Sequence, residues 1–530
     1  MVSDDTNLIR SSSFMALGTI FSRITGFIRS LMIVAVLGTG LLGDAYNVGN
    51  TTPNIIYNLL IGGSLTAVFV PQIIRAFRND DGGNLFISRL VTALFSLLLL
   101  ITALAMVAAP LLVDLYAPTL DDRSRNLTLS FTLYCLPQIL FYGLFGLLGQ
   151  ITNAKEQFGP MMWAPIANNL VVIALFGYFL SLTNEISLGT ISDEQVRLLG
   201  LGTTSGIILQ SLILIPFLVK SGISIRPRFD WRKSGLSKSF RLGGWTFLSV
   251  LISQLGFLVT VNLATRAGVS SVASGITYGA GYTPYANAYL ILLLPHSIIA
   301  ISLVTALLPK LSTLVIDQQK EILRERIISV TRIMGVAIVP AAIFFLLFGT
   351  FVSQSIFAGL DLESSKYLGN VLSAFALGAI PLSINLVGIR VLNAYENTKL
   401  QAASNAVINI VAVLFSLLAF RLLSPQYVAI GLAASFAISY WIGFVVTDLF
   451  VSRFIGSTLL IKQLPFYFKL IFLALISIGS VRTVIAVTDI AGNFFSLSIV
   501  LLATSLTYLL VARLFKVSEV GEMMKSILRR

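Results

Sequence analysis

Apolar runs of about 20 residues follow one another along almost the whole chain, and no other feature limits the fold so strongly. A run of that length, wound as a helix, crosses the hydrocarbon core of a bilayer and satisfies its backbone hydrogen bonds internally. Charged residues make up only 11% of the chain and hydrophobic residues 56%, whereas a soluble chain carries about 25% charged residues. The sequence therefore predicts an all-α polytopic membrane protein.

We count fourteen such spans. The second and the eighth contain Pro53 and Pro295, and we expect a kink or a broken turn at each, because proline removes a backbone donor. The N-terminal stretch MVSDDTNLIR has acids where a signal peptide has cations, so we expect an uncleaved first span. The predicted spans cover residues 12–38, 46–74, 90–113, 128–152, 160–182, 199–219, 242–265, 276–308, 328–350, 368–392, 401–422, 426–450, 464–486 and 492–514.

The positions of lysine and arginine orient these spans. With the N terminus in the cytoplasm, 27 of the 36 basic residues fall in cytoplasmic segments, an asymmetry that the positive-inside rule predicts. This asymmetry accounts for the net charge of +13 without a nucleic-acid partner. The basic stretch 220–241 could also contact anionic lipid headgroups. Outside the membrane on the other face lie only Arg123, Arg125, Arg197, Arg266, Lys366, Arg421 and Arg482.

Residue usage excludes several kinds of chemistry. The single Cys135 cannot form an intramolecular disulfide, and the single His296 cannot supply a zinc triad. A membrane glycosyltransferase would need a carboxylate or metal pair near the bilayer surface, and the predicted outer loops are short and show no metal-ligand spacing. We therefore expect a transporter with no catalytic residues, no metal and no cofactor, and not an enzyme.

Two passages of the chain resemble each other at a shift of 240 residues. The stretch NAKEQFGPMMWAPIANNLVV from Asn153 aligns without gaps to NAYENTKLQAASNAVINIVA from Asn393, which pairs Asn169 with Asn409. We infer two parallel six-helix lobes with a central cavity between them, where transporters of this kind bind cargo and rock for alternating access. The predicted parts are a lobe at 1–219, a basic cytoplasmic linker at 220–241, a lobe at 242–452, and two extra spans with a basic tail at 453–530.

The first span contains FSRITGFIRS, in which Arg23 and Arg29 lie among apolar residues. Each lies about 11 residues, or roughly 16 Å, from the nearer end of the span, beyond the reach of its own side chain to the interface. Burying an arginine at mid-membrane costs about 2.5–3.5 kcal/mol or more. The pattern predicts a water-filled cavity or an anionic cargo, and the alternative is internal ion pairing.

Four further residues are candidates to line this cavity or gate it. Gly26 leaves room between the arginines, and Ser22 is on the helix face of Arg29. Asp44 follows the first span and is a lip residue, a gate contact or a solvated loop acid. Asn54 follows the proline of the second span, and either lines the cavity or satisfies backbone freed there. Because the arginine fork matches phosphate oxygens, a cavity with arginines and no compensating carboxylate favours an anion over a drug cation.

The chain resembles the MurJ (MviN) family of lipid II flippases, in the multidrug/oligosaccharidyl-lipid/polysaccharide exporter superfamily. The likeness is carried by FSRITGFIRS, by GDAYNVGNTTPN at 43–54, by AVFVPQ at 67–72 and by TALLPKLS at 305–312. It implies that Arg23 and Arg29 bind the pyrophosphate of undecaprenyl-linked peptidoglycan precursor (lipid II) and that Asp44 is required. It further implies flipping from the inner to the outer leaflet of the bacterial cytoplasmic membrane.

The resemblance has departures. Well-studied family members carry further arginines where this chain has Tyr57, Asn58 and Leu290. These departures leave another polyprenyl-pyrophosphate-linked saccharide open beside lipid II. A cation-coupled drug exporter of the same fold is a separate alternative, which would not require the arginines. The implied partners are the lipid-linked precursor, anionic lipids at the cytoplasmic face and cell-wall synthesis proteins.

An even number of spans predicts that both termini lie in the cytoplasm. A reporter that is active only in the cytoplasm, fused after Arg530, should therefore be active in cells. Activity of a reporter that works only on the outer face would instead show that the count of spans is odd.

Overall fold

The structure is a computed structural model, and it describes residues 2–59, 70–78, 81–155, 157, 159–182, 186–230, 244–276, 278–357, 359–488 and 492–521. Within these ranges the chain is helical and contains no β-strand. It divides into two compact units, Met1–Arg266 and Ala267–Arg530. Most of the predicted linker 220–241 lies outside the described residues, which there end at 230.

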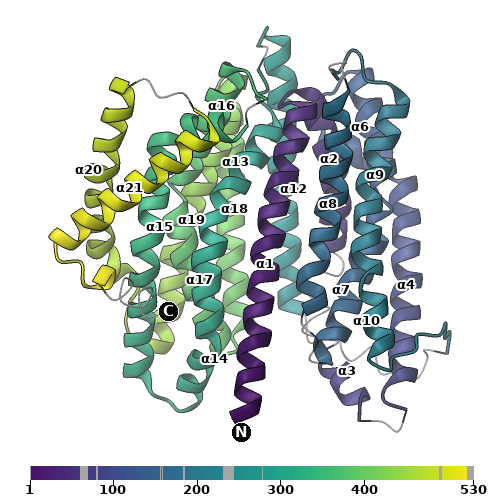
Figure 1. The fold of residues 1–530 in the computed structure, drawn as a ribbon, viewed down its shortest axis with the longest axis horizontal. Helices are drawn as coiled ribbons and strands as arrows, with labels where there is room; N and C mark the ends of the chain where they lie inside the picture. Colours follow the sequence, from purple (N-terminus) through teal and green to yellow (C-terminus); the bar gives the residue numbers. More distant parts are fainter. Residues whose placement is uncertain are drawn as a thin grey trace. The chain divides into compact units, whose positions relative to one another are not determined.

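The first unit contains the helices drawn from purple to dark teal in Figure 1. They are α1 (Val2–Leu37), α2 (Leu41–Tyr57), α3 (Val70–Ala76), α4 (Asn84–Val107), α5 (Ala109–Tyr116), α6 (Asp122–Cys135), α7 (Gln138–Ala154), α8 (Gly159–Ser181), α9 (Asp193–Leu212), α10 (Leu214–Lys220) and the larger part of α12 (Gly244–Ala273).

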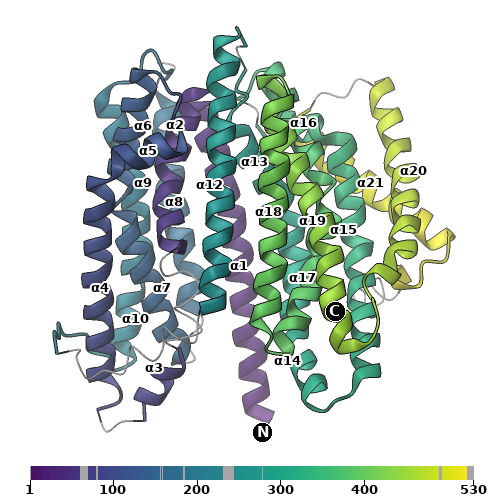
Figure 2. The same cartoon turned by 180° about the vertical axis from the view of Figure 1, so that it is seen from behind.

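The second unit runs on to the C-terminal helices, drawn in yellow in Figure 2. Its helices are α13 (Tyr282–Pro295), η4 (His296–Ile301), α14 (Ser302–Ile316), α15 (Lys320–Ile356), α16 (Leu362–Ala376), α17 (Ala379–Ala394), α18 (Thr398–Leu422), η5 (Pro425–Tyr427), α19 (Val428–Ile455), η6 (Ile461–Gln463), α20 (Leu464–Thr488) and α21 (Phe494–Leu514).

The expected membrane spans are largely confirmed. Among the described residues twelve helices are long and apolar enough to cross a membrane, and the pair α16–α17, bent by 42°, makes a thirteenth if it counts as one span. Each of the thirteen overlaps one predicted span. The remaining predicted span, 46–74, corresponds to α2 and α3, between which residues 60–69 are not described. The all-α membrane fold is thus established, and the count of fourteen stays a prediction.

The helix break expected at Pro295 is confirmed. Helix α13 ends at this proline, and the π-helical turn η4 follows before α14 begins. His296 opens that turn, is buried, and shares a hydrogen bond of 2.9 Å between its Nδ1 and Ser383 Oγ. At Pro53, by contrast, α2 continues to Tyr57 before residues 58–59 adopt a π-helical pattern.

The 240-residue spacing of the sequence repeat recurs in the helix boundaries. Asp121 caps α6 by accepting a hydrogen bond from the backbone of Ser124, and Asp361 caps α16 in the same way. Helices α7 and α17 end at Ala154 and Ala394. Because the boundary between the two units falls inside α12, the predicted lobe limits near 219 and 242 stay predictions.

Helix α1 packs along α8 (Figure 1). Gly18 permits the close approach, since a Cβ built there would lie 2.6 Å from Nε1 of Trp163. The ring of Phe21 stacks on the same tryptophan at a centroid distance of 5.9 Å. Small residues at helix contacts let backbones approach in this way, and here they hold the arginine-bearing helix against its neighbour.

Helix α2 packs against α6 at Gly49. A Cβ built on Gly49 would lie 2.8 Å from Phe131 Cβ and 2.9 Å from the backbone nitrogen of Thr132. Nearby, the buried ring of Tyr46 contacts Phe131 edge-on at 5.4 Å and Phe176 at 5.5 Å. These contacts set the rotation of α2, and so decide which way its polar residues point.

Gly49→Ala should destabilise the protein, because the new methyl group would overlap atoms of the α6 backbone. Overpacking of this kind costs about 1–3 kcal/mol, so the melting temperature in detergent should fall by several degrees. Gly40→Ala is the matched control, because a Cβ there meets nothing within 4 Å. Equal melting temperatures for the two variants would contradict the close α2–α6 contact.

Candidate anion-binding site

The two arginines of α1 occupy different surroundings. Arg23 is exposed, whereas Arg29 is half-buried and its Nε is shielded from solvent without a hydrogen-bond partner. The described side chains provide neither arginine with an ion pair. Internal ion pairing, the alternative left open by the sequence, therefore finds no support in the part of the chain that the structure covers.

Four polar residues follow one another along α2 at intervals of four. Tyr46, Asn50, Asn54 and Asn58 therefore lie along one side of the helix and its continuation. The last two are joined, since Asn58 Nδ2 donates to Asn54 Oδ1 at 2.7 Å. A polar stripe inside an apolar helix has to be matched by polar groups on its neighbours, because unpaired amides are costly to bury.

Helix α7 supplies those groups from Gln138 and Tyr142, which are also four residues apart. Gln138 Nε2 donates to Asn50 Oδ1 at 3.4 Å. The Tyr142 hydroxyl is hydrogen-bonded by the side chain of Asn54. The ring of Tyr142 stacks on Tyr57 at 5.9 Å, so its hydroxyl is held in place beside the stripe.

Arg29 completes this arrangement from α1. Its charge acts electrostatically on the hydroxyls of both Tyr46 and Tyr142. We call Arg29, Asn54, Asn58 and Tyr142 the Arg29 cluster. It combines a permanent cation with a phenol and two amides, all able to donate hydrogen bonds, and contains no carboxylate. Such a set suits the oxygens of a phosphate, which accept charge-assisted hydrogen bonds.

Ser22 and Gly26 lie where α1 meets α8. Asn169 of α8 donates its Nδ2 to the backbone oxygen of Ser22 and to Thr25 Oγ1, both at 3.0 Å. The room that Gly26 leaves is taken by the same amide, because a Cβ there would lie 3.4 Å from Asn169 Nδ2. Asn169 thus fixes the rotation of α1 between its two arginines.

Asp44 lies in the first turn of α2, not in a loop, and is 2% exposed. This excludes the reading of a solvated loop acid. A carboxylate is favoured at this place because the amino end of a helix carries a partial positive charge. Its role as a lip or gate residue stays a prediction.

The structure also locates the three residues that stand where well-studied family members have arginines. Tyr57 stacks on Tyr142, and Asn58 binds Asn54, so both take part in or support the Arg29 cluster. Leu290 lies in α13 of the second unit. Neutral polar and aromatic side chains therefore occupy the part of α2 where further arginines were expected.

Two residues at this site were missed from the sequence alone. Asn169 stood in the repeated passage, where its pairing with Asn409 was the available signal. Tyr142 stood four residues after Gln138 in an apolar run, a spacing that marks one helix face. Neither pattern indicates which other helix the side chain would meet.

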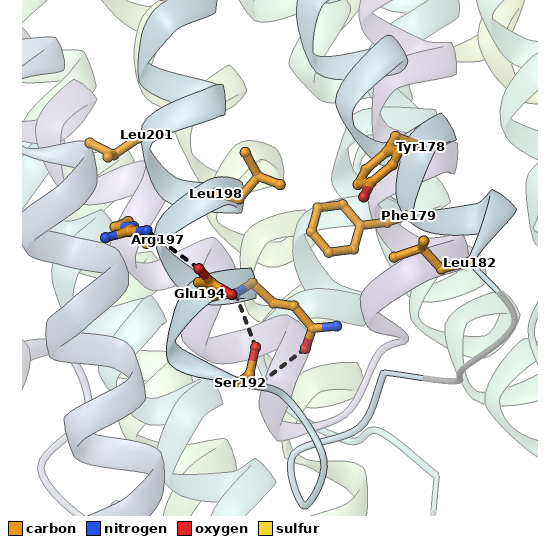
Figure 3. A pocket seen from close by; sticks show the side chains of 9 residues that line it. Tyr178, Phe179, Leu182, Ser192, Glu194, Arg197, Leu198 and Leu201 are labelled. Carbon is orange, nitrogen blue, oxygen red and sulfur yellow. Dashed lines mark hydrogen bonds and ion pairs between the residues drawn. The ribbon is translucent and has the colours of Figure 1, made fainter.

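A pocket of about 520 Å³ lies elsewhere in the first unit, between the end of α8 and the start of α9 (Figure 3). Tyr178, Phe179 and Leu182 form one side of it. Its polar groups on α9 are paired locally: Ser192 and Gln195 form a reciprocal helix cap, and Arg197 contacts Glu194 at 3.8 Å. None of the predicted site residues lines this pocket.

No group of three or more histidine, cysteine, aspartate or glutamate side chains is placed to hold a metal in the described ranges.

Comparisons with known sequences agree on one family. The sequence model described as "Lipid II flippase MurJ" matches residues 33–512, a range that begins after Arg29. A "Probable lipid II flippase MurJ" of Thermotoga maritima is 24% identical over 98% of both chains. One of Haemophilus influenzae is 25% identical, in an alignment that covers 48% of this chain and only 50% of the relative.

Solved structures share the fold. The structure "Lipid II flippase MurJ, inward closed conformation" superposes with a TM-score of 0.74 at 18% identity, and covers 94% of this chain and 98% of that chain. An inward-facing multidrug resistance transporter of the MATE family gives 0.63 at 15% identity, with 83% and 99% covered.

Tyr142→Phe should weaken the binding of a diphosphate. The variant keeps the ring stacked on Tyr57 and loses only the hydroxyl, and a hydrogen bond to a charged group contributes about 1.5–3 kcal/mol. We expect the affinity of the detergent-solubilised protein for farnesyl diphosphate to fall at least about tenfold.

Tyr57→Phe is the matched control, since it removes a hydroxyl from the stacking partner. Its affinity should stay within about twofold of the original, and both variants should melt at the same temperature as the parent. An unchanged affinity in Tyr142→Phe would remove Tyr142 from the site.

Proposed function

The chain belongs to the MurJ family of lipid II flippases, and from that premise we propose that it carries lipid II from the inner to the outer leaflet by alternating access. Lipid II is the undecaprenyl-pyrophosphate-linked precursor of peptidoglycan. On this proposal the protein is a multi-pass transporter of the bacterial cytoplasmic membrane, and it makes and breaks no covalent bond.

The observation that carries the proposal is the Nε of Arg29, which is shielded from solvent and has no hydrogen-bond partner in the described structure. A diphosphate cannot cross hydrocarbon unaided, because moving an ion out of water costs tens of kcal/mol in a medium of low dielectric constant. A guanidinium stays charged at every physiological pH and offers two parallel donors to phosphate oxygens. Arg29 and the donors of Tyr142 and Asn54 would replace the water that the diphosphate loses.

Arg23 has a different part in this proposal. It is exposed, six residues before Arg29 and so on another side of α1. We infer that it meets the diphosphate on its way to or from Arg29, while the lobes alternate around the cargo. Ser22 and Gly26 act by seating α1 on Asn169, and Asp44 acts as a gate residue at the end of the same hairpin.

Contacts between loops support the proposed topology, in which an even number of spans separates the start of α4 from the segment after α10. The start of α4 is joined to residues after α10 by hydrogen bonds between Asn84 and the backbone of Gly222 and Ser224. On the opposite side, Arg123 donates to the backbone oxygen of Gly189. The start of α4 and the segment after α10 therefore lie on one side of the membrane, and the proposed topology assigns that side to the cytoplasm because it carries more lysine and arginine.

The MATE-type exporters share the fold, but a cation exporter requires an acidic site. The Arg29 cluster has the opposite sign, so the observations favour an anionic cargo. Between lipid II and another polyprenyl-pyrophosphate-linked saccharide, mass spectrometry of the lipid that co-purifies with the protein would decide. Anionic lipids and cell-wall synthesis proteins are proposed as further partners.

Loss of the charge at 29 or 23 should abolish transport without unfolding the protein. We expect Arg29→Ala and Arg23→Ala to lose complementation of a depleted strain and lipid translocation in vesicles. Arg→Lys at either position should recover part of the activity, because lysine keeps the charge and loses the bidentate fork.

Arg197→Ala is the control, since Arg197 is exposed and pairs only within α9. Melting temperatures measured in detergent separate the two explanations. Removing one member of an internal ion pair would destabilise the protein by about 3–5 kcal/mol, whereas loss of a cargo contact leaves the stability unchanged. Fully active alanine variants at both positions would refute the proposed site.

A further inference from the structure

The segment that follows α10 does not leave the first unit as a free loop. Residues 222–230 run in an extended conformation along the first turns of α4, and we call them the linker strand. They belong to the basic stretch for which the sequence suggested only contact with lipid headgroups. The structure gives this part of the stretch a defined conformation.

Three side chains of α4 hold the linker strand in register. Asn84 Oδ1 accepts from the backbone nitrogen of Ser224 at 2.8 Å. Ser88 Oγ accepts from the nitrogen of Arg226 at 3.1 Å, and Thr92 Oγ1 accepts from that of Arg228 at 3.0 Å. Ser88 and Thr92 are themselves buried.

The register follows from matching lengths. Four residues of helix rise about 6.0 Å, and two residues of strand rise about 6.6 Å. Side chains four apart on α4 therefore meet every second backbone nitrogen of the linker strand. The same alternation divides its side chains between two faces. Ile223 is buried and Ile225 packs on the apolar core around α4, so Arg226 and Arg228 share the other face.

The far end of the linker strand is also tied down. Asp230 forms an ion pair and hydrogen bond with Arg89 of α4, which holds the pKa of that carboxyl below its usual range. Arg89 is therefore already paired with a carboxylate within the protein. Arg226 and Arg228 are exposed and form no ion pair with any side chain that the structure describes.

We propose that Arg226 and Arg228 form a binding site for the phosphate of a lipid headgroup at the cytoplasmic surface of the membrane. Their Cα atoms are about 6.6 Å apart on one face of a strand, a spacing from which both guanidiniums can reach one phosphate or diphosphate. Helix α4 is long and apolar enough to cross a membrane, and its apolar run is predicted to begin at residue 90. The linker strand lies beside the polar turns that precede this run, where we expect the headgroups.

Attachment to α4 is what makes this site more than a basic loop. A free loop would lose backbone freedom of about 1–2 kcal/mol per residue on binding, whereas this backbone is ordered before the lipid arrives. The ligand chemistry, a lipid phosphate, has two sources. One is the anionic phospholipid of the leaflet, and the other is a diphosphate-linked lipid that awaits transport.

Native mass spectrometry of the full chain in detergent, titrated separately with phosphatidylglycerol and undecaprenyl diphosphate, tests the site. Arg226→Gln/Arg228→Gln should weaken binding about 30-fold, which is the combined effect expected of two basic residues near anionic lipid. The control is Arg75→Gln/Arg78→Gln, which removes the same charge from two exposed arginines of the predicted cytoplasmic face. Because these two arginines lie off the linker strand and no bilayer surface is present in detergent, the affinity should change less than about threefold.

The double variant Ser88→Ala/Thr92→Val tests whether lipid binding depends on the ordered backbone of the linker strand as well as on the charge of its two arginines. It keeps both arginines and releases the linker strand, and it should weaken lipid binding while hydrogen exchange at residues 222–230 accelerates. If faster exchange leaves the affinity unchanged, the preordered site is refuted. Weakened binding of both lipids identifies a general headgroup site, and weakened binding of the diphosphate alone identifies a receiving site for cargo.

Equal affinities of the Arg226→Gln/Arg228→Gln protein and its control for both lipids would overturn the proposal. The measurement contains no translocation step. Its failure would therefore leave the proposed flippase activity untouched, and a failure of the flippase proposal would leave phosphatidylglycerol binding to be explained.

Discussion

The permanent charge of Arg29 inside an apolar helix is the constraint around which the polar interior of the first unit is arranged. A carboxylic acid or a lysine can shed its charge when it is buried, but a guanidinium cannot. Its surroundings must therefore offer polar groups or a ligand. The described structure places two tyrosine hydroxyls within its electrostatic reach and leaves its Nε unpartnered.

In the first unit, neutral amide and phenol side chains offer hydrogen-bond donors at positions where further arginines would add charge. Asn58 and Tyr57 stand at two of the positions where well-studied family members have further arginines. Asn58 binds Asn54, and Tyr57 stacks on Tyr142. Each additional buried guanidinium would add its own desolvation cost, whereas amides and phenols can be satisfied by one another until a ligand arrives. The Asn58–Asn54–Tyr142 chain is such an arrangement, since every member has a partner within the protein. On the proposed function, such an arrangement would let a site with fewer arginines receive a diphosphate.

The two proposed phosphate sites, at Arg29 and at Arg226 and Arg228, are held in place by the same kind of contact between segments. In both, side chains four residues apart on one helix meet polar groups of another segment: Gln138 and Tyr142 meet the stripe of α2, and Asn84, Ser88 and Thr92 meet the linker strand. Hydrogen bonds made in this way order the segment before a ligand binds, so less conformational entropy remains to be lost. The arginines then act from fixed positions.

The sequence by itself determined the elements that depend on local hydrophobicity. Runs near 20 residues predicted thirteen of the spans at the places where helices are found, and Pro295 predicted the break before η4, since helix length and proline geometry are properties of neighbouring residues. It also singled out Arg29, because a charge in an apolar run is visible without a fold. Only the tertiary structure decided that Tyr142 meets Asn54, that Asn169 holds α1 at Ser22, and that Arg226 and Arg228 are held on α4. Those groupings join residues more than 80 positions apart in the chain, and they depend on how each helix is rotated by contacts such as Gly49 against Phe131, which a single sequence does not display.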